Sequence, residues 1–410
     1  MTGFRLALLA LLILGQLVAW RWWSKPIQSL WARAVLKTVY VMINLVTVLA
    51  IGQLYVLEQL PPNHFLFAYL YRPAFTWQFG HVIWLFVAMS IWLIATIRRS
   101  LSRRDQGLPL LFRAKNKGFS QTRAILLAWF LIMGMVFYAY GFQLKDPRVN
   151  QINLVIPDLP PSLEGLRIAH LSDFHYGLGL DEVELTRRLT QTASLKPDLV
   201  ILTGDLLDSQ SSLARDWREP LKKLQAVRLG VYGVLGNHDM YATNPAEQTH
   251  LLTEFGARIL RDEAVSLPGA PLTIVGFDDP GTPSHFFRPD SQSDTLNFAA
   301  IEGLPAPEGN FILVVRHRPQ GLASAAQAGA KLYLAGHTHG GQFQIPWFPR
   351  WNLMTFTTPY SQGRFQLNRA HLIINNGLSS AGLPFRLWSW PEIGLITLTR
   401  LETPVPRLDS

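Results

Sequence analysis

The chain has 410 residues, a length that accommodates two or three domains of ordinary size. Hydrophobic residues make up 49% of it, a share that indicates a membrane-embedded part. The sequence contains no cysteine, which excludes disulfides and thiolate metal sites. Any metal must therefore bind His, Asp, Glu or Asn side chains.

The net charge of +9 is divided unevenly along the chain. Residues 1–142 carry a charge of +12, whereas residues 143–410 carry −3. A nucleic-acid-binding protein would be expected to place its basic residues on the polar half of the chain. We therefore expect no nucleic-acid partner.

The N-terminal part contains four apolar runs, each close to the ~20 residues that cross a bilayer. They lie at residues 4–20, 39–57, 74–97 and 124–142. Helices on the surface of a soluble domain keep a polar face, and these runs do not. Residues 1–142 are therefore predicted to form a transmembrane helical region of about four spans. The first run lacks a small-residue cleavage site, which favours an uncleaved span over a signal peptide.

The loops between the runs predict an orientation in the membrane. Loops 21–38 and 98–123 carry four and eight Lys or Arg residues, whereas loop 58–73 carries only Arg72. Positive loops remain in the cytoplasm, so four spans place everything after about residue 143 on the outer face of the cytoplasmic membrane. One span more or fewer reverses this assignment. Loop 98–123 is also a candidate lipid-binding segment, although a role in topology alone explains its charge more simply.

The polar half begins with residues 143–165, which are rich in proline and predict a linker that includes one edge strand, VNQINLVI. Over residues 166–410, short β-rich runs alternate with helical stretches, which predicts βαβ units. Strands are expected at 167–172, 198–203, 231–235, 272–277, 311–316, 331–335, 371–375 and 394–400. Helices are expected at 181–195, 212–227, 245–255 and 320–328. Residues 279–309 predict a long surface loop.

Polar clusters follow the predicted strands at the points where the strands end. The clusters are SDFHYG with Asp173 and His175, GDLLD with Asp205 and Asp208, GNHD with Asn237, His238 and Asp239, RHRP with His317, and GHTHGG with His337 and His339. In open α/β folds, ligands bind at the carboxyl ends of the strands. Intervals of 32 residues separate Asp173 from Asp205 and Asp205 from Asn237, so these clusters are expected on adjacent strands.

These clusters supply too many oxygen and nitrogen donors for one ion. The seven donors are Asp173, His175, Asp205, Asn237, His317, His337 and His339. Their chemistry suits divalent Mn, Fe or Zn, whereas a Ca or Mg site would use oxygen ligands alone. Two ions about 3.5–4 Å apart are the arrangement used for phosphoryl hydrolysis. Each motif alone is common by chance, but five in order at strand ends predict a dimetal site.

The same blocks resemble the signatures of calcineurin-like metallophosphoesterases. The later stretches NNGLSSAGLPFRL and PEI resemble the membrane-anchored bacterial branch of that family. The resemblance covers about residues 166–400 and implies a four-layer αββα sandwich. It implies one metal held by Asp173, His175, Asp205 and His339, and another held by Asp205, Asn237, His317 and His337.

The resemblance also implies catalytic roles. Asp205 would bridge two divalent ions, and a metal-bound hydroxide would be the nucleophile. His238 would act as general acid or phosphate contact, and Asp239 would orient it. Arg318 departs from the family pattern; we expect it to contact a phosphate oxygen, with a solvent-facing arginine as the equal alternative.

These patterns predict a membrane-anchored, metal-dependent hydrolase of phosphoric mono- or diesters, with manganese among the candidate ions. The expected partners are the phosphate-ester substrate and membrane lipids; no protein partner is implied. The aromatic loop 345–356 keeps open a pyrophosphatase acting on a lipid-linked nucleotide such as UDP-2,3-diacylglucosamine. Such enzymes act in the cytoplasm, which conflicts with the predicted orientation. The same aromatics could instead pack against residues 384–391. A non-catalytic membrane scaffold with a vestigial metal site would be marked by lost ligands, and none is lost.

Overall fold

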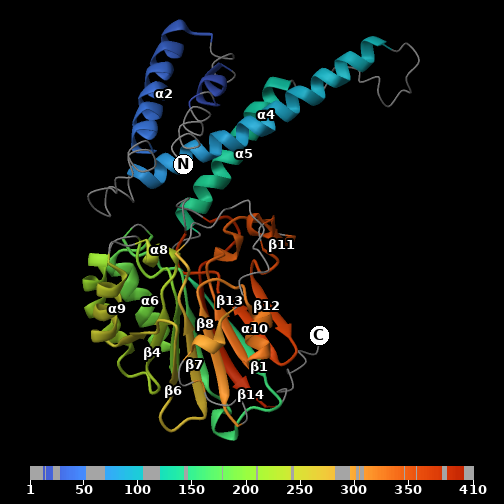
Figure 1. Ribbon diagram of the computed structural model, residues 1–410. Coiled ribbons are helices and arrows are strands. Elements are labelled where there is room, and N and C mark those ends of the chain that lie inside the picture. The colour runs from blue at the N-terminus through green and yellow to red at the C-terminus, as the bar shows by residue number, and fades with distance from the viewer. Residues whose placement is uncertain are drawn as a thin grey trace, which may run out of the picture. The chain divides into compact units, whose positions relative to one another are not determined.

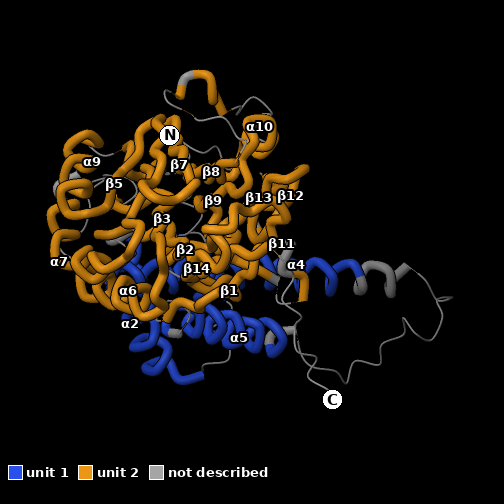
Figure 2. The backbone as a smooth tube through the Cα atoms, turned by 90° about the horizontal axis from the view of Figure 1, so that it is seen from below, with its two compact units in different colours: residues 1–142, 383–385 blue, residues 143–382, 386–410 orange. Residues whose placement is uncertain are grey.

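The computed structural model (Figure 1) contains two compact units. Figure 2 shows them in different colours: one comprises Met1–Phe142 with Leu383–Phe385, and the other comprises Gln143–Gly382 with Arg386–Ser410. The structure describes residues 13, 15–21, 28–51, 70–104, 121–142, 146–177, 179–208, 211–241, 244–281, 296–301, 304, 309–345, 347–356, 358–380 and 386–400. Each unit is described by itself.

The N-terminal unit contains three long apolar helices in its described part. They are α2 (Leu30–Ile51), α4 (Arg72–Arg104) and α5 (Gln121–Phe142). Stretches within them are long and apolar enough to cross a membrane: Leu30–Leu49, Arg72–Ile97 and Arg123–Gly141. The predicted runs 74–97 and 124–142 coincide with α4 and α5.

The other two predicted spans have different outcomes. The run 39–57 is wrong at its start, because α2 begins at Leu30, where the hydroxyl of Ser29 accepts a hydrogen bond from the backbone N–H of Ala32. Hydropathy marked only the more apolar part of that helix. Most of the run 4–20 lies outside the described residues, although residues 15–21 are helical.

Polar side chains are buried between the helices of this unit and bond to one another. The side-chain amide of Gln78 donates to Thr47 and accepts from Gln16 at 2.8 Å. The indole N–H of Trp129 donates to Nε2 of His81 at 3.1 Å. Polar groups at membrane depth require such internal partners, so these contacts specify how the helices associate.

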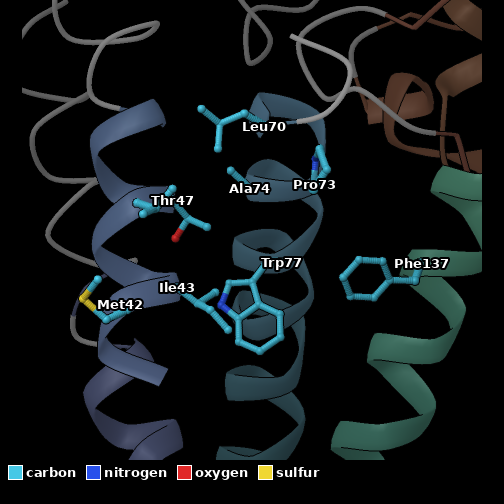
Figure 3. A pocket seen from close by; sticks show the side chains of 9 residues that line it. Met42, Ile43, Thr47, Leu70, Pro73, Ala74, Trp77 and Phe137 are labelled. Carbon is cyan, nitrogen blue, oxygen red and sulfur yellow. The ribbon is translucent and has the colours of Figure 1, made fainter. Parts of the chain in front are cut away.

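The same helices line an open pocket of about 380 Å³. Figure 3 shows side chains that line it, among them Met42, Ile43, Ala74, Trp77 and Phe137. The lining is apolar apart from the Thr47 hydroxyl and the Trp77 indole, and it offers no ligand suited to a metal ion. This pocket is therefore separate from the chemistry that the strand-end motifs predict.

The C-terminal unit is built on two six-stranded mixed sheets. The first has the order β1-β14-β2-β3-β4-β5 and the second β12-β13-β9-β8-β7-β6. Their strands are β1 (Arg148–Val155), β2 (Arg167–Leu171), β3 (Leu199–Thr203), β4 (Val231–Val234), β5 (Ala257–Ile259), β6 (Glu263–Ser266), β7 (Leu272–Phe277), β8 (Phe311–Arg316), β9 (Leu332–Ala335), β12 (Gly363–Leu367), β13 (Ala370–Ile374) and β14 (Glu392–Thr399). A separate hairpin joins β10 (Gln344–Ile345) to β11 (Phe348–Asn352).

Three apolar cores separate four layers. Alternate residues of a strand face opposite sides of a sheet, and β3 shows the result. Its Val200 and Leu202 pack against helices α6 (Glu182–Ser194) and α9 (Pro245–Glu254), whereas Leu199 and Ile201 face the second sheet. A third core lies between the second sheet and α10 (Leu322–Gln327). This arrangement is the predicted αββα metallophosphoesterase sandwich.

Most predicted elements of this unit are present, and the differences have local causes. All eight predicted strands form, but the short strands β5, β6, β10, β11 and β12 were not predicted. The predicted helix 212–227 is instead a succession of η4 (Ser211–Trp217), α7 (Arg218–Leu221) and η5 (Lys222–Leu224). Pro220 lies in this stretch and lacks the N–H that a continuous helix requires.

Residues 143–165 contribute to the sheet as well as to the connection. The edge strand β1 pairs in parallel with β14 over eight residues, from Arg148 opposite Glu392 to Val155 opposite Thr399. The compact unit therefore begins before residue 166. Most of the predicted loop 279–309 lies outside the described residues.

The strand directions bring the polar loops to one end of the sandwich. Strands β2, β3 and β4 run parallel, so the loops that follow them emerge at the same edge. Figure 1 shows the short helix α8 (Asn237–Met240) and strand β11 at the same end of the two sheets. This edge carries the candidate site.

Candidate metal centre

The backbone of the donor loops has an unusual conformation. Five of the seven predicted donors have φ between 45° and 70°, and these are Asp173, His175, Asp205, His337 and His339. Residues other than glycine rarely occupy this left-handed region, and each such residue costs about 1–3 kcal/mol. Strained residues of this kind cluster at functional sites.

Two glycines allow the donor loops to approach one another. A Cβ atom on Gly336 would lie 1.8 Å from the hydroxyl of Ser172 and 2.6 Å from a carboxylate oxygen of Asp173. A Cβ atom on Gly236 would lie 2.2 Å from the Asp205 carboxylate. The motifs GHTHGG and GNHD thus require glycine because only a residue without a side chain fits there.

The first group of donors contains Asp173, His175 and His339, all buried. Nε2 of His339 lies 3.2 Å from the Asp173 carboxylate and 3.2 Å from Nε2 of His175. Nε2 of His175 also lies 3.6 Å from Oδ2 of Asp205. These atoms converge on one point, as the ligands of a single ion do.

The second group contains Asp205, His317 and His337. Nε2 of His317 lies 3.2 Å from Oδ2 of Asp205 and 3.1 Å from Nδ1 of His337. Oδ1 of Asn237 is buried and has no hydrogen-bond partner among the described residues, so it is available as a further ligand. Oδ2 of Asp205 lies near both groups, which is the geometry of a bridging carboxylate.

The tautomer of His317 favours a cation beside the Asp205 carboxylate. Nδ1 of His317 lies 2.7 Å from the carbonyl of Thr203 and donates to it, so Nε2 faces the Asp205 carboxylate. Nδ1 of His339 lies 3.1 Å from the carbonyl of Ser379 and 3.0 Å from Nη2 of Arg386, so these contacts do not select one tautomer. A ring lone pair and a carboxylate repel each other unless a proton or a metal ion lies between them. Carbonyl-oriented histidines are typical of metal sites, and the donors present fit divalent ions.

The electrostatics of several donors suit the ligand states that metals require, but His317 differs: burial opposes its protonation, and Asp205 nevertheless raises its pKa to about 10. Burial lowers the pKa of His337 and of His339 well below 6.5, which keeps both rings neutral. Burial alone would raise the pKa of Asp205, but His317 and His238 hold it well below its usual range. Burial raises the pKa of Asp173 to about 6, a shift that a bound cation would reverse.

His238 lies at the edge of the cluster and is partly exposed. Its backbone N–H donates to Oδ1 of Asp205 at 2.9 Å, and its Nδ1 contacts Oδ1 of Asp208 at 2.9 Å. Burial opposes protonation of this ring, but Asp205 and Asp208 raise its pKa to about 9. A protonated imidazole at this position can donate a proton to a leaving group.

Asp239, which is expected to orient His238, makes several hydrogen bonds to the neighbouring loops. Its carboxylate is buried and accepts hydrogen bonds from four groups: the backbone N–H groups of Leu206, Leu207 and Gly236 and the side-chain amide of Gln248. Asp239 therefore fastens the Asp205 loop to the GNHD loop, and its charge helps to raise the pKa of His238. Asp208 contacts His238 directly; it belongs to the GDLLD motif but received no role from the sequence.

Arg318, for which phosphate contact is expected, is paired with a carboxylate. Its Nε and Nη2 atoms donate to the two carboxylate oxygens of Asp279 at 2.7 and 3.1 Å. Both side chains are buried, so the guanidinium does not face solvent. The two-pronged geometry expected for phosphate is used for this carboxylate.

Sequence reasoning gave no role to Arg386, which contacts the ligand loops. Its side chain is fully buried, and its Nε donates to the carbonyl of Ser379 at 2.8 Å. Its Nη1 donates to the carbonyl of His339 at 3.2 Å. Ser379 is the residue whose carbonyl orients His339, so Arg386 stabilises the position of that ring. The available signal was a lone charge in the apolar stretch PFRLWSWP.

Fold and site together define a metallophosphoesterase domain. Residues 166–341 match the family model of calcineurin-like phosphoesterases, and this part of the chain belongs to that family. The chain is 30% identical over 293 residues to a transmembrane protein with metallophosphoesterase domain from Danio rerio, a match that covers 65% of this chain and 61% of that protein.

Other relatives share the same part of the chain. The protein of the same description from Bos taurus is 30% identical over 62% of this chain and 57% of its own length. The metallophosphoesterase YkuE of Bacillus subtilis is 27% identical over 64% of this chain and 89% of its own length. The chain thus spans about three fifths of the length of the two vertebrate relatives.

Proposed function

We propose that the C-terminal unit hydrolyses phosphoric mono- or diesters with the help of two divalent ions, Mn, Fe or Zn. The apolar helices of the N-terminal unit anchor it in a membrane. The observation that carries the proposal is the position of Asp205, whose Oδ2 lies 3.2 Å from His317 and 3.6 Å from His175, one residue from each donor group.

The side chains of the cluster have distinct tasks in this proposal. When bound, two divalent ions neutralise phosphate charge and acidify water. Asp173, His175 and His339 hold one ion, and His317, His337 and Asn237 hold the other, with Asp205 shared. His238 donates its proton to the departing oxygen, and Asp208 keeps its ring in place. Burial of the donors excludes competing water from their ligand atoms.

The test uses the full chain, purified in detergent and loaded with manganese. Metal content and turnover of bis-p-nitrophenyl phosphate and p-nitrophenyl phosphate are measured together; the ratio of the two rates separates diesterase from monoesterase. Asp205→Asn should lose both ions and turnover. Asp158→Asn, which alters an ion pair outside the site, is the matched control. Bound metal without turnover of any ester would favour the scaffold alternative.

A lipid-linked phosphate or pyrophosphate, such as UDP-2,3-diacylglucosamine, is the second candidate substrate. It is supported by the aromatic loop beside the site, where Trp347 is 83% exposed rather than packed against its own chain. Turnover of the lipid-linked compound in vesicles is compared with that of a water-soluble ester. Equal or lower efficiency on the lipid would exclude this candidate.

We also propose that the protein is a multi-pass protein of the cytoplasmic membrane with this unit on the outer face. The basic loops 21–38 and 98–123 support this orientation. Two reporters fused after Ser410 test it, one active only outside the cytoplasm and one fluorescent only inside. Fluorescence of the second reporter would reverse the orientation.

A further inference from the structure

Exposed aromatic side chains concentrate beside the metal centre. In the described part of the C-terminal unit, seven large apolar side chains are exposed, and three of them lie within five residues: Trp347, Phe348 and Trp351. They are exposed by 83%, 61% and 68%. These three side chains are called the aromatic rim below. Such a concentration on a folded surface marks an interaction site.

The aromatic rim is fastened to a ligand loop. The hairpin β10–β11 that carries it begins at Gln344, whose side-chain amide donates to the carbonyl of Gly340 at 2.8 Å. At the other end of the hairpin, Asn352 packs so closely that a Cβ atom on Gly341 would lie 2.2 Å from it. The rim is therefore held beside the loop that contains His337 and His339.

A second strand contact supports the base of the hairpin and adds a fourth aromatic residue. The backbone N–H of Gln344 donates to the carbonyl of Leu387 at 3.0 Å, and Phe343 forms a bridge with Trp388. Trp388 is 38% exposed. The aromatic surface thus extends from the hairpin to a neighbouring segment on the same side of the site.

The sheet topology shows at which edge of the sheet the chain from α5 enters. Helix α5, a candidate span, ends at Phe142, and β1 begins at Arg148, so five residues connect them. A fully extended chain of that length spans roughly 20 Å, a limit set by the covalent chain alone. β1 runs antiparallel to β2, because Arg148 pairs with Glu392 and β14 is antiparallel to β2. Arg148 therefore enters the sheet at the edge that carries the metal ligands.

We infer that the aromatic rim inserts into the interfacial layer of the membrane that α5 crosses. Tryptophan combines an apolar ring with a polar N–H and concentrates at the level of the lipid headgroups. The short connection keeps the ligand-bearing edge within reach of that layer, and the rim lies on this edge. The metal centre consequently opens at the lipid surface.

The absence of cysteine from the chain allows a direct test. Trp347→Cys and Trp351→Cys are spin-labelled separately in the full chain, which is reconstituted in nanodiscs of phosphatidylcholine and phosphatidylglycerol. Ser194→Cys is the matched control, since Ser194 is exposed and lies at the end of α6, just before β3 enters from the opposite edge. Metal content and turnover of p-nitrophenyl phosphate show that each labelled protein is folded.

The inference predicts high oxygen accessibility and low aqueous-nickel accessibility at both rim labels, and the reverse at residue 194. The rim labels should also lose their oxygen preference when the lipid is replaced by a polymer that lacks acyl chains. Rim labels as accessible to aqueous nickel as residue 194 would overturn the inference. Spin–spin broadening between copies without lipid contact would overturn it as well, because a second copy would then cover the rim.

Discussion

Oδ1 of Asp208 lies 2.9 Å from Nδ1 of His238. This contact holds the His238 ring beside the donor cluster, with its centroid 4.6 Å from that of His175. Asp208→Asn should weaken this orientation and the preference for the protonated ring. We expect kcat to fall roughly 10- to 100-fold, less than the roughly 100- to 10,000-fold that a positioned general acid contributes, because the ring itself remains. Metal content and KM should change little, and both are measured with kcat.

The partner variant separates this contact from a general effect on the fold. His238→Ala should lose at least as much kcat as Asp208→Asn. The double variant should lose no more than His238→Ala alone, because residues that act as a unit are not additive. Additive losses would mean that Asp208 acts without His238.

The two donor groups should lose their ions selectively. His339→Ala removes a ligand from the first group of donors, and His317→Ala removes one from the second group. Each variant should retain about one of two metal equivalents after dialysis, whereas Asp205→Asn retains neither, since its carboxylate is shared. Mass spectrometry of the metals checks this. Loss of both metal equivalents in either histidine variant would contradict separate ion sites.

The ion pair between Arg318 and Asp279 should contribute to stability rather than to substrate binding. Asp279→Asn leaves a buried guanidinium without this carboxylate, which typically costs about 3–5 kcal/mol. Asp198→Asn, which alters an exposed pair with Arg228, should cost less than about 1 kcal/mol. Denaturant unfolding measures both. A raised KM in Arg318→Lys at unchanged stability would restore the phosphate-binding role.

Glu392 should make stability fall as pH rises. Burial raises its pKa from 4.5 to about 7, so the folded protein keeps a proton that the unfolded chain releases between these values. Folding therefore loses free energy with rising pH across this interval. Glu392→Gln stays neutral and should gain up to about 3 kcal/mol relative to the parent between pH 5 and pH 8. Parallel pH profiles of the two proteins would contradict the shift.

Sequence patterns locate residues along the chain better than they locate their side chains in space. The clusters at Asp173, Asp205 and Asn237 were predicted on adjacent strands because buried β runs and glycines mark strand ends directly. The hydrogen-bond partner of His238 was not predicted. Asp239 is adjacent to it in sequence, but both residues lie on the same short helix, α8. Consecutive helical residues point in different directions and do not face each other.

Other features depend on contacts that no local pattern contains. Asp279 is 39 residues from Arg318, and Arg386 is 47 residues from His339, so neither pairing is visible in a motif. The hairpin β10–β11 has a two-residue strand, too short for an alternating pattern to register. The sequence was equally consistent with aromatic side chains packed against residues 384–391 and with exposed ones. Only the folded chain distinguishes these two arrangements.

The position of β14 constrains the order in which the protein can be completed during synthesis. This strand, Glu392–Thr399, is inserted between β1 and β2, which both precede it by more than 200 residues. Strand β1 thus finds its neighbour in the sheet only after residues 392–399 have left the ribosome. A chain truncated before residue 392 would present two unpaired strand edges, and its helices would already have entered the bilayer.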